Sequence, residues 1–176
     1  MADDLRSAPV PPIGPDDHVR GPADAPTVFV YADFTCPRCA LAWERVDGAP
    51  LRLVFRHLAL KAKHPRAVAL ACAAEAAARQ GAFWPFADSL FADSGHIDDP
   101  HLWARCPDLG LDVDRFEADR RAPAVLERVR ADVRAGLRAG VTVTPTFFAG
   151  DAMHPGAPDA DLVAFWTNGP EHPAHR

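Results

Sequence analysis

Two hydrophobic runs in the first third of the chain have the pattern of buried β-strands. Residues 27–32 form a near-continuous series of apolar, β-branched and aromatic side chains, which is typical of a central strand covered on both faces. Residues 51–56 form a second run of this kind. Between them, residues 40–45 are good helix formers that lead to a stop at Asp47-Gly48. The order strand, helix, strand predicts a right-handed parallel crossover.

After residue 64 the pattern changes to helices only. No strand-like run interrupts the chain until residue 140, and four segments with helical character precede a fifth, longer one: residues 65–80, 84–91, 99–105 and 112–121. The fifth begins at Pro123 and places apolar residues every fourth position, with charged residues between them, up to a stop at Gly140: Val125, Val129, Val133 and Leu137. We therefore expect this last segment to be an amphipathic helix with these four residues buried.

The chain then returns to β-structure. Residues 146–149 form a strand candidate and Gly150-Asp151 a turn. We expect the chain to pair again around Met153-His154 before a short helix at residues 159–165. The fold class expected is therefore α/β, with a helical segment inserted into a β/α core. The expected boundaries are a flexible proline-rich arm, a two-part core, a helical insertion and a flexible tail: residues 1–15, 16–63 with 141–167, 64–140, and 168–176.

Composition narrows the class of function. The chain has 176 residues, of which 48% are hydrophobic, enough for the core of a single domain. A formal charge of -5, without a basic stripe, argues against nucleic acid as a partner. The first residues lack the basic and apolar regions of a secretory signal, and no apolar run reaches the roughly 18 residues of a membrane span. We expect a soluble, cytoplasmic protein without direct membrane insertion.

The sequence Cys36-Pro37-Arg38-Cys39 carries the strongest chemical signal. It lies where an apolar strand ends and a helix begins, so unpaired N–H groups and the helix dipole should stabilise a thiolate on Cys36 and lower its pKa below about 8.5. Pro37 suits the first helical turn, and Arg38 adds a positive charge between the sulfurs. Cys39, one turn further on, is predicted to be the less exposed, resolving thiol. Pro37 and Arg38 are thus candidates for redox tuning.

Alternative roles for these cysteines are a structural zinc site and a disulfide scaffold. Four cysteines are too few for a scaffold in a chain of this size, and zinc would need two further ligands with their own spacing. Cys72 and Cys106 each fit as small buried hydrophobes on helices; the alternative for them is a second, regulatory disulfide. We predict no metal and no cofactor. No metal-ligand spacing is found among the histidines, which are His18, His57, His64, His96, His101 and His154, with His172 and His175 in the tail.

With these residues in view, the chain resembles the DsbA-like proteins of the thioredoxin fold over residues 16–165. Two segments carry most of the resemblance, residues 17–21 (DHVRG) and 34–39 (FTCPRC). Others agree with the same family: residues 55–58 (FRHL), 64–65 (HP), 83–84 (FW) and 140–148 (GVTVTPTFF). The resemblance implies a thioredoxin core interrupted by a helical subdomain, and redox chemistry at the cysteine pair.

The resemblance also assigns roles near residue 145. It implies a cis proline at Pro145 that faces Cys36, with Thr144 and Pro145 binding an extended substrate through the main chain and excluding metal from the thiolates. Many relatives place a buried Glu six residues before the first cysteine, where this chain has Val30. Asp33 is a candidate proton relay in its place, with a turn at the end of the strand as the alternative role.

These observations together predict a protein disulfide oxidoreductase that works through a mixed disulfide. Its substrates would be protein or small-thiol disulfides, and its redox partner thioredoxin, glutathione or a dedicated reductase or oxidase. The alternative is a non-enzymatic module of the same fold, a redox sensor or a partner of a membrane transporter, with slow turnover. A glutathione-linked transferase on the same core is disfavoured because such enzymes usually lack an intact C-x-x-C.

Overall fold

The computed structural model describes residues 8–60 and 62–169, which form one mixed sheet and the helices around it. The sheet has the strand order β1-β3-β2-β4-β5. Its strands are β1 (His18–Arg20), β2 (Thr27–Ala32), β3 (Arg52–His57), β4 (Thr146–Ala149) and β5 (Ala152–Pro155). The helices are α1 (Pro37–Val46), α2 (Ala67–Ala78), α3 (Phe83–Ala92), α4 (Asp99–Asp108), α5 (Val113–Asp119), α6 (Pro123–Arg138) and α7 (Ala160–Asn168).

The central strands β2 and β3 run parallel, as the strand-helix-strand pattern predicts, and α1 connects them. β1 pairs antiparallel with β3, β4 with β2, and β5 with β4. In the register of the central pair, Ala32 lies opposite His57. The residues that follow β2 and β3 therefore leave the sheet at the same edge, which is where the cysteine turn begins.

The alternation of β2 divides the core between the two faces of the sheet. Val28, Val30 and Ala32 belong to the large cluster that includes α1 and α3, whereas Tyr31 belongs to a smaller cluster on the other face, with Phe29 packed against it. Successive side chains of a strand point to opposite faces, so a strand that is apolar at every position must be covered on both.

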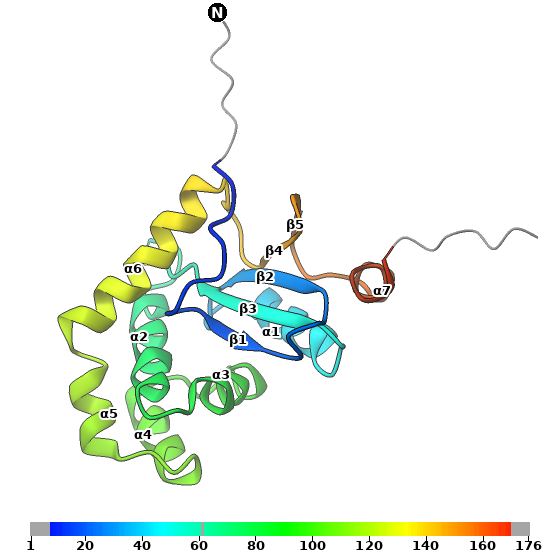
Figure 1. Ribbon diagram of the computed structural model, residues 1–176. Helices are drawn as coiled ribbons and strands as arrows, with labels where there is room; N and C mark the ends of the chain where they lie inside the picture. The colour runs from blue at the N-terminus through cyan, green and yellow to red at the C-terminus, as the bar shows by residue number, and fades with distance from the viewer. Residues whose placement is uncertain (1–7, 61, 170–176) are drawn as a thin grey trace, which may run out of the picture.

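The helices α2–α6 follow one another along the chain. In the view of Figure 1 they lie to the left of and below the sheet, while α7 lies to its right. α2 packs against α3, α5 and α6, and α6 reaches β3. Within the described residues, no helix is long and apolar enough to cross a membrane.

The buried stripe of α6 differs from the one predicted. Val125 and Val129 are buried, but Val133 is only partly buried and Leu137 is half exposed. The stripe continues through Asp132 and Gly136 instead. A step of four residues turns about 400° around a helix of 3.6 residues per turn, so a strict spacing of four drifts off the buried face within three steps. The prediction for Leu137 was therefore wrong.

Both ends of the described chain are more structured than expected. Residues 8–15 have no regular secondary structure, yet the N–H of Ala8 donates to the carbonyl of Arg138, and Val10 packs against the cluster of Tyr31. α7 runs to Asn168, three residues beyond the predicted end. The remainder of the predicted arm and tail, residues 1–7 and 170–176 with His172 and His175, lies outside the described residues.

Candidate active site

A tight turn delivers the first cysteine to the start of α1. The N–H of Cys36 donates to the carbonyl of Asp33 at 3.1 Å, and Oδ1 of Asp33 accepts from the N–H and the hydroxyl of Thr35 at 2.8 and 2.7 Å. Cys36 occupies the N-cap position with extended backbone, and Pro37 begins the helix. The backbone N–H groups of Arg38 and Cys39 in the first turn lie near enough to the Cys36 sulfur to lower its pKa.

The second partner of Cys36 comes from a distant part of the chain. Its sulfur lies 3.5 Å from the carbonyl oxygen of Thr144, to which it donates when it is protonated, and the peptide bond between Thr144 and Pro145 is cis. The carbonyl of Pro145 accepts from the N–H of Gly156 at 2.7 Å, which ties this loop to the residue that follows β5. The structure therefore brings together four residues that the sequence analysis singled out: Cys36, Cys39, Thr144 and Pro145.

The two thiols are free and have opposite electrostatic environments. A hydrogen bond from the thiol of Cys39, opposed by burial, and further bonds from the backbone N–H groups of Cys39 and Arg38 lower the pKa of Cys36 to about 5. At neutral pH Cys36 is therefore a thiolate, the form that attacks disulfides.

Cys39 is the deeper of the pair, only 1% exposed against 8% for Cys36. Burial raises its pKa well above the ordinary range, and its hydrogen bond to Cys36 acts in the same direction. The N–H of Asp33 points at the Cys39 sulfur from 3.5 Å. The site thus holds a thiolate nearer the surface and a protonated thiol that is more deeply buried.

The remaining predicted residues take less direct positions. Arg38 is exposed, and its guanidinium lies beside Gly156, 3.4 Å from where a Cβ on that glycine would be. Its backbone N–H contributes to the lowered pKa of Cys36. The carboxylate of the buried Asp33 closes the turn through Thr35, which is the alternative role that the sequence left open for it.

Cys72 and Cys106 are buried free thiols in separate hydrophobic clusters. Cys72 packs among alanines of α2 and valines of α6, and the thiol of Cys106 donates to the carbonyl of Leu102 within its own helix. Burial raises the pKa of both thiols, so neither has the character of a reactive cysteine.

One polar cluster was missed by the sequence analysis. His18, His57 and Glu75 come from β1, β3 and α2 and meet in the interior, although they are 18 or more residues apart in the sequence. No local spacing could have revealed them. The one signal in the sequence was a lone Glu among the alanines of a helix that is otherwise buried.

Comparisons with known proteins agree on the fold. The family described as "DSBA-like thioredoxin domain" matches residues 47–165. A thioredoxin-like oxidoreductase from Silicibacter pomeroyi DSS-3 superposes with a TM-score of 0.78 at 26% identity, covering 87% of this chain and 91% of that one. The thiol-disulfide exchange protein alpha-DsbA2 from Wolbachia pipientis gives 0.74 at 17% identity, covering 83% and 82%. The predicted fold class is confirmed.

The curated relatives are described as antiporters, whereas the similar solved structures are described as oxidoreductases. The chain is 42% identical to a Na⁺/H⁺ antiporter NhaA from Herminiimonas arsenicoxydans over 91% of its own length and 27% of that protein. It is 45% identical to Na⁺/H⁺ antiporter NhaA 3 from Salinispora tropica, over 82% of this chain and 23% of that protein. The chain thus spans about a quarter of the length of the curated relatives that it matches.

Proposed function

Because the chain belongs to the DsbA-like thioredoxin domain family, we propose that it is a thiol/disulfide oxidoreductase that exchanges disulfides with protein substrates through Cys36 and Cys39. The observation that carries this proposal is the asymmetry of the pair: Cys36 has a pKa of about 5, whereas burial keeps Cys39 protonated. A nucleophile and a resolving thiol need these two different environments.

The reaction proceeds in two exchanges. The Cys36 thiolate attacks one sulfur of a substrate disulfide, forming a Cys36–substrate disulfide and expelling the other substrate sulfur as a thiolate. Cys39 then loses its proton and attacks the Cys36 sulfur, which forms the Cys36–Cys39 disulfide and releases the second substrate thiolate. The substrate gains two electrons and the protein loses two. The reverse sequence oxidises a substrate dithiol, and the potential of the redox partner sets the direction.

Substrate binding is assigned to the loop that faces the nucleophile. The Thr144 carbonyl lies 3.5 Å from the Cys36 sulfur, at the edge where an extended peptide could add main-chain hydrogen bonds. Recognition of this kind reads backbone rather than side chains, so the proposed substrates are broad in sequence. The proposed electron partner is thioredoxin, glutathione or a dedicated reductase or oxidase.

Trapping of the mixed disulfide tests this proposal. Without Cys39 the mixed disulfide cannot be resolved, so Cys39→Ala incubated with a disulfide-bonded peptide should accumulate a covalent adduct at Cys36. Mass spectrometry identifies the adduct and its position. The control Cys72→Ala, which keeps the pair intact, should turn over without accumulating it. Absence of an adduct in Cys39→Ala, or an adduct at another cysteine, would overturn the proposal.

The antiporter relatives favour a second candidate function, a redox-sensing module that acts with a membrane transporter rather than as a catalyst. The two functions differ in turnover. An enzyme reduces many equivalents of peptide disulfide per chain when glutathione or thioredoxin re-reduces it, whereas a sensor stops near one equivalent because its oxidised form returns slowly. Counting equivalents in that assay separates them.

A further inference from the structure

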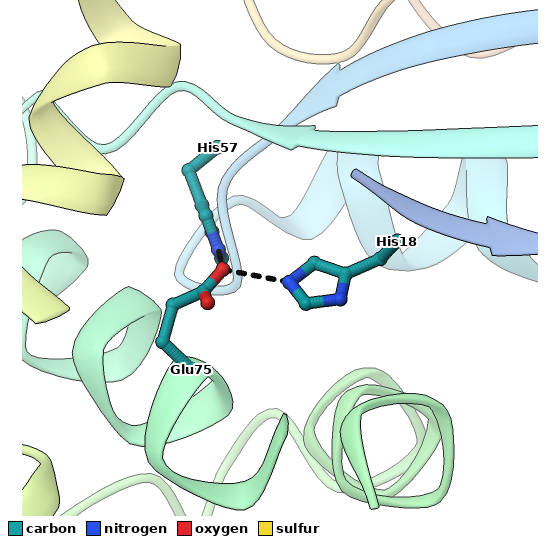
Figure 2. A group of neighbouring side chains, drawn as sticks. All are labelled: His18, His57 and Glu75. Carbon is teal, nitrogen blue, oxygen red and sulfur yellow. Dashed lines mark hydrogen bonds and ion pairs between the residues drawn. The ribbon is translucent and has the colours of Figure 1, made fainter. Parts of the chain in front are cut away.

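His18, His57 and Glu75 form a cluster whose hydrogen bonds, among the described residues, include neither Cys36 nor Cys39. Nε2 of His18 is 2.7 Å from Oε1 of Glu75, and Nε2 of His57 is 2.8 Å from the same oxygen. Figure 2 shows the carboxylate of Glu75 rising from α2 between the two imidazoles. The three candidate ligand atoms all lie within 4.8 Å of one another.

The two imidazoles are held in place by aromatic rings. His18 stacks on Phe83 with ring centroids 3.5 Å apart and planes 6° from parallel. His57 meets Phe34, Phe55 and Phe83 edge-on, at 6.0, 5.2 and 6.2 Å. The side chain of His57 is 1% exposed, that of Glu75 9% and that of His18 14%. The three donors are therefore fixed and largely withdrawn from solvent before any ligand arrives.

A cavity of about 630 Å³ gives access to this cluster from outside. His18 and Glu75 line it, together with residues of the segment before β1, of α2 and of α6. Its ionisable lining comprises four carboxyl groups and two guanidinium groups: Asp16, Asp17, Glu75 and Glu127 with Arg79 and Arg128. With the imidazoles neutral, this lining has a net negative charge, which favours a cation over an anion.

We propose that His18, His57 and Glu75 form a binding site for a divalent transition-metal ion of the zinc type. Two imidazole nitrogens and one carboxylate oxygen are the three-ligand set that zinc accepts when a fourth position is left to water, and the cavity beside His18 and Glu75 gives that water room. This site does not depend on the proposed redox function.

Metal binding requires the three ligand atoms, which lie within 4.8 Å of one another, to rearrange. Bonds of about 2.0–2.1 Å in a tetrahedral arrangement separate neighbouring ligand atoms by about 3.3 Å. The N···O distances of 2.7 and 2.8 Å must therefore open by about half an ångström, which rotation of the Glu75 carboxylate can supply. The two N–H···O hydrogen bonds are lost, and each imidazole then carries its proton on Nδ1 while Nε2 binds the ion.

The test is Zn²⁺ binding to the full chain with Cys36 and Cys39 in the disulfide form, which removes the competing thiolates. Competition against a chromophoric chelator should show one Zn²⁺ per chain. Glu75→Gln and His18→Asn should each weaken binding by more than the about 10- to 100-fold that loss of an outer-shell partner costs. The matched control is His96→Asn with His101→Asn, an exposed pair with ring centroids 4.6 Å apart, and it should bind like the unaltered protein.

A second measurement on the unaltered chain keeps the test decisive if a variant fails to fold. Co²⁺ in place of Zn²⁺ should give the visible bands of tetrahedral nitrogen and oxygen coordination, without the sulfur-to-cobalt band that Cys72 or Cys106 would produce. Absence of binding, retention of full affinity in Glu75→Gln, loss in the His96/His101 variant, or a sulfur-to-cobalt band would each overturn the proposal. The cluster would then be a hydrogen-bonded tie between α2 and the sheet.

Discussion

At the scale of single residues, the proposed chemistry depends on how one helical turn separates two identical side chains. Cys36 sits at the N-cap of α1, where N–H groups stabilise a negative charge, and Cys39 lies one turn inside, where burial opposes one. The sequence C-P-R-C at the end of an apolar strand was enough to predict this difference. The motif alone does not place the Thr144 carbonyl, 108 residues away, beside Cys36; the family resemblance anticipated that residue.

The pH dependence of alkylation tests the state of Cys36 directly. A thiolate reacts and a thiol does not, so the alkylation rate of the reduced protein should rise with a midpoint near pH 5. In Cys39→Ala the midpoint should move to higher pH, because the hydrogen bond from Cys39 is the largest cause of the lowered pKa. Cys72→Ala should leave the midpoint unchanged. An ordinary midpoint near about 8.5 in the unaltered protein would contradict this description of the site.

At the scale of elements, periodicity predicted most of the fold. β2 and β4 occupy residues 27–32 and 146–149 as predicted, and each predicted helix is present within a few residues of its expected ends. β1 was missed, since three residues are too short for an alternating pattern and the strand is recognisable only by its pairing with β3. The shift of the buried face of α6 towards Asp132 and Gly136 was not predicted, because a glycine gives no hydrophobic signal for a core position.

Gly136 marks the place where α6 touches the sheet. A Cβ at this position would lie 2.9 Å from two ring carbons of Tyr31 and 3.1 Å from a methyl group of Leu58, both fully buried. Gly136→Ala should therefore lower the free energy of unfolding by about 1–2 kcal/mol, although alanine is the better helix former by about 1 kcal/mol. Urea titration measures the change.

The matched control on the same helix is Arg134→Ala. Its exposed side chain pairs only with Glu127 in the described part of the chain, so the change should stay within about 0.5 kcal/mol. If Gly136→Ala were more stable than the unaltered protein, Tyr31 would be free to move and the close packing of α6 on the sheet would be wrong.

At the scale of the whole molecule, buried polar contacts join parts of the chain that the sequence shows as separate. Arg56 of β3 binds Asp17 through two hydrogen bonds of 2.8 Å, with side chains 4% and 7% exposed. Glu75 of α2 binds the histidines of β1 and β3. Such pairs could not be predicted, because nothing local relates their members. Loss of Asp17 is costly because it leaves the buried charge of Arg56 uncompensated.

Asp17→Asn should lower the free energy of unfolding at pH 7 by about 3 kcal/mol, because the Arg56 guanidinium stays buried without its counter-charge. Asp151→Asn, in an exposed turn, is the control and should change it by less than about 0.5 kcal/mol. Denaturant titration of both variants checks the difference. Equal stability of the two variants would show that the pair contributes little.

The same carboxylates contribute to the dependence of stability on pH. Burial opposes the charged forms, but hydrogen bonds from Arg56 lower the pKa of Asp17, and those from the histidines lower the pKa of Glu75. A group with a depressed pKa in the folded state stabilises the fold above its unfolded pKa, about 4, and this stability is lost as pH falls below it. The free energy of unfolding should thus fall from about pH 5 towards pH 2, less steeply in Asp17→Asn. A pH-independent free energy would contradict this.

The most direct test of the proposed function is the redox equilibrium of Cys36 and Cys39 in glutathione buffers, read by thiol alkylation and mass spectrometry. We expect a two-electron transition that disappears when either cysteine is replaced. Its potential should lie towards the oxidising end of the range from about -270 to about -120 mV, because a thiolate stabilised to a pKa of about 5 favours the reduced form. No transition, or a transition that persists without Cys36, would contradict the proposal that this pair is the redox centre.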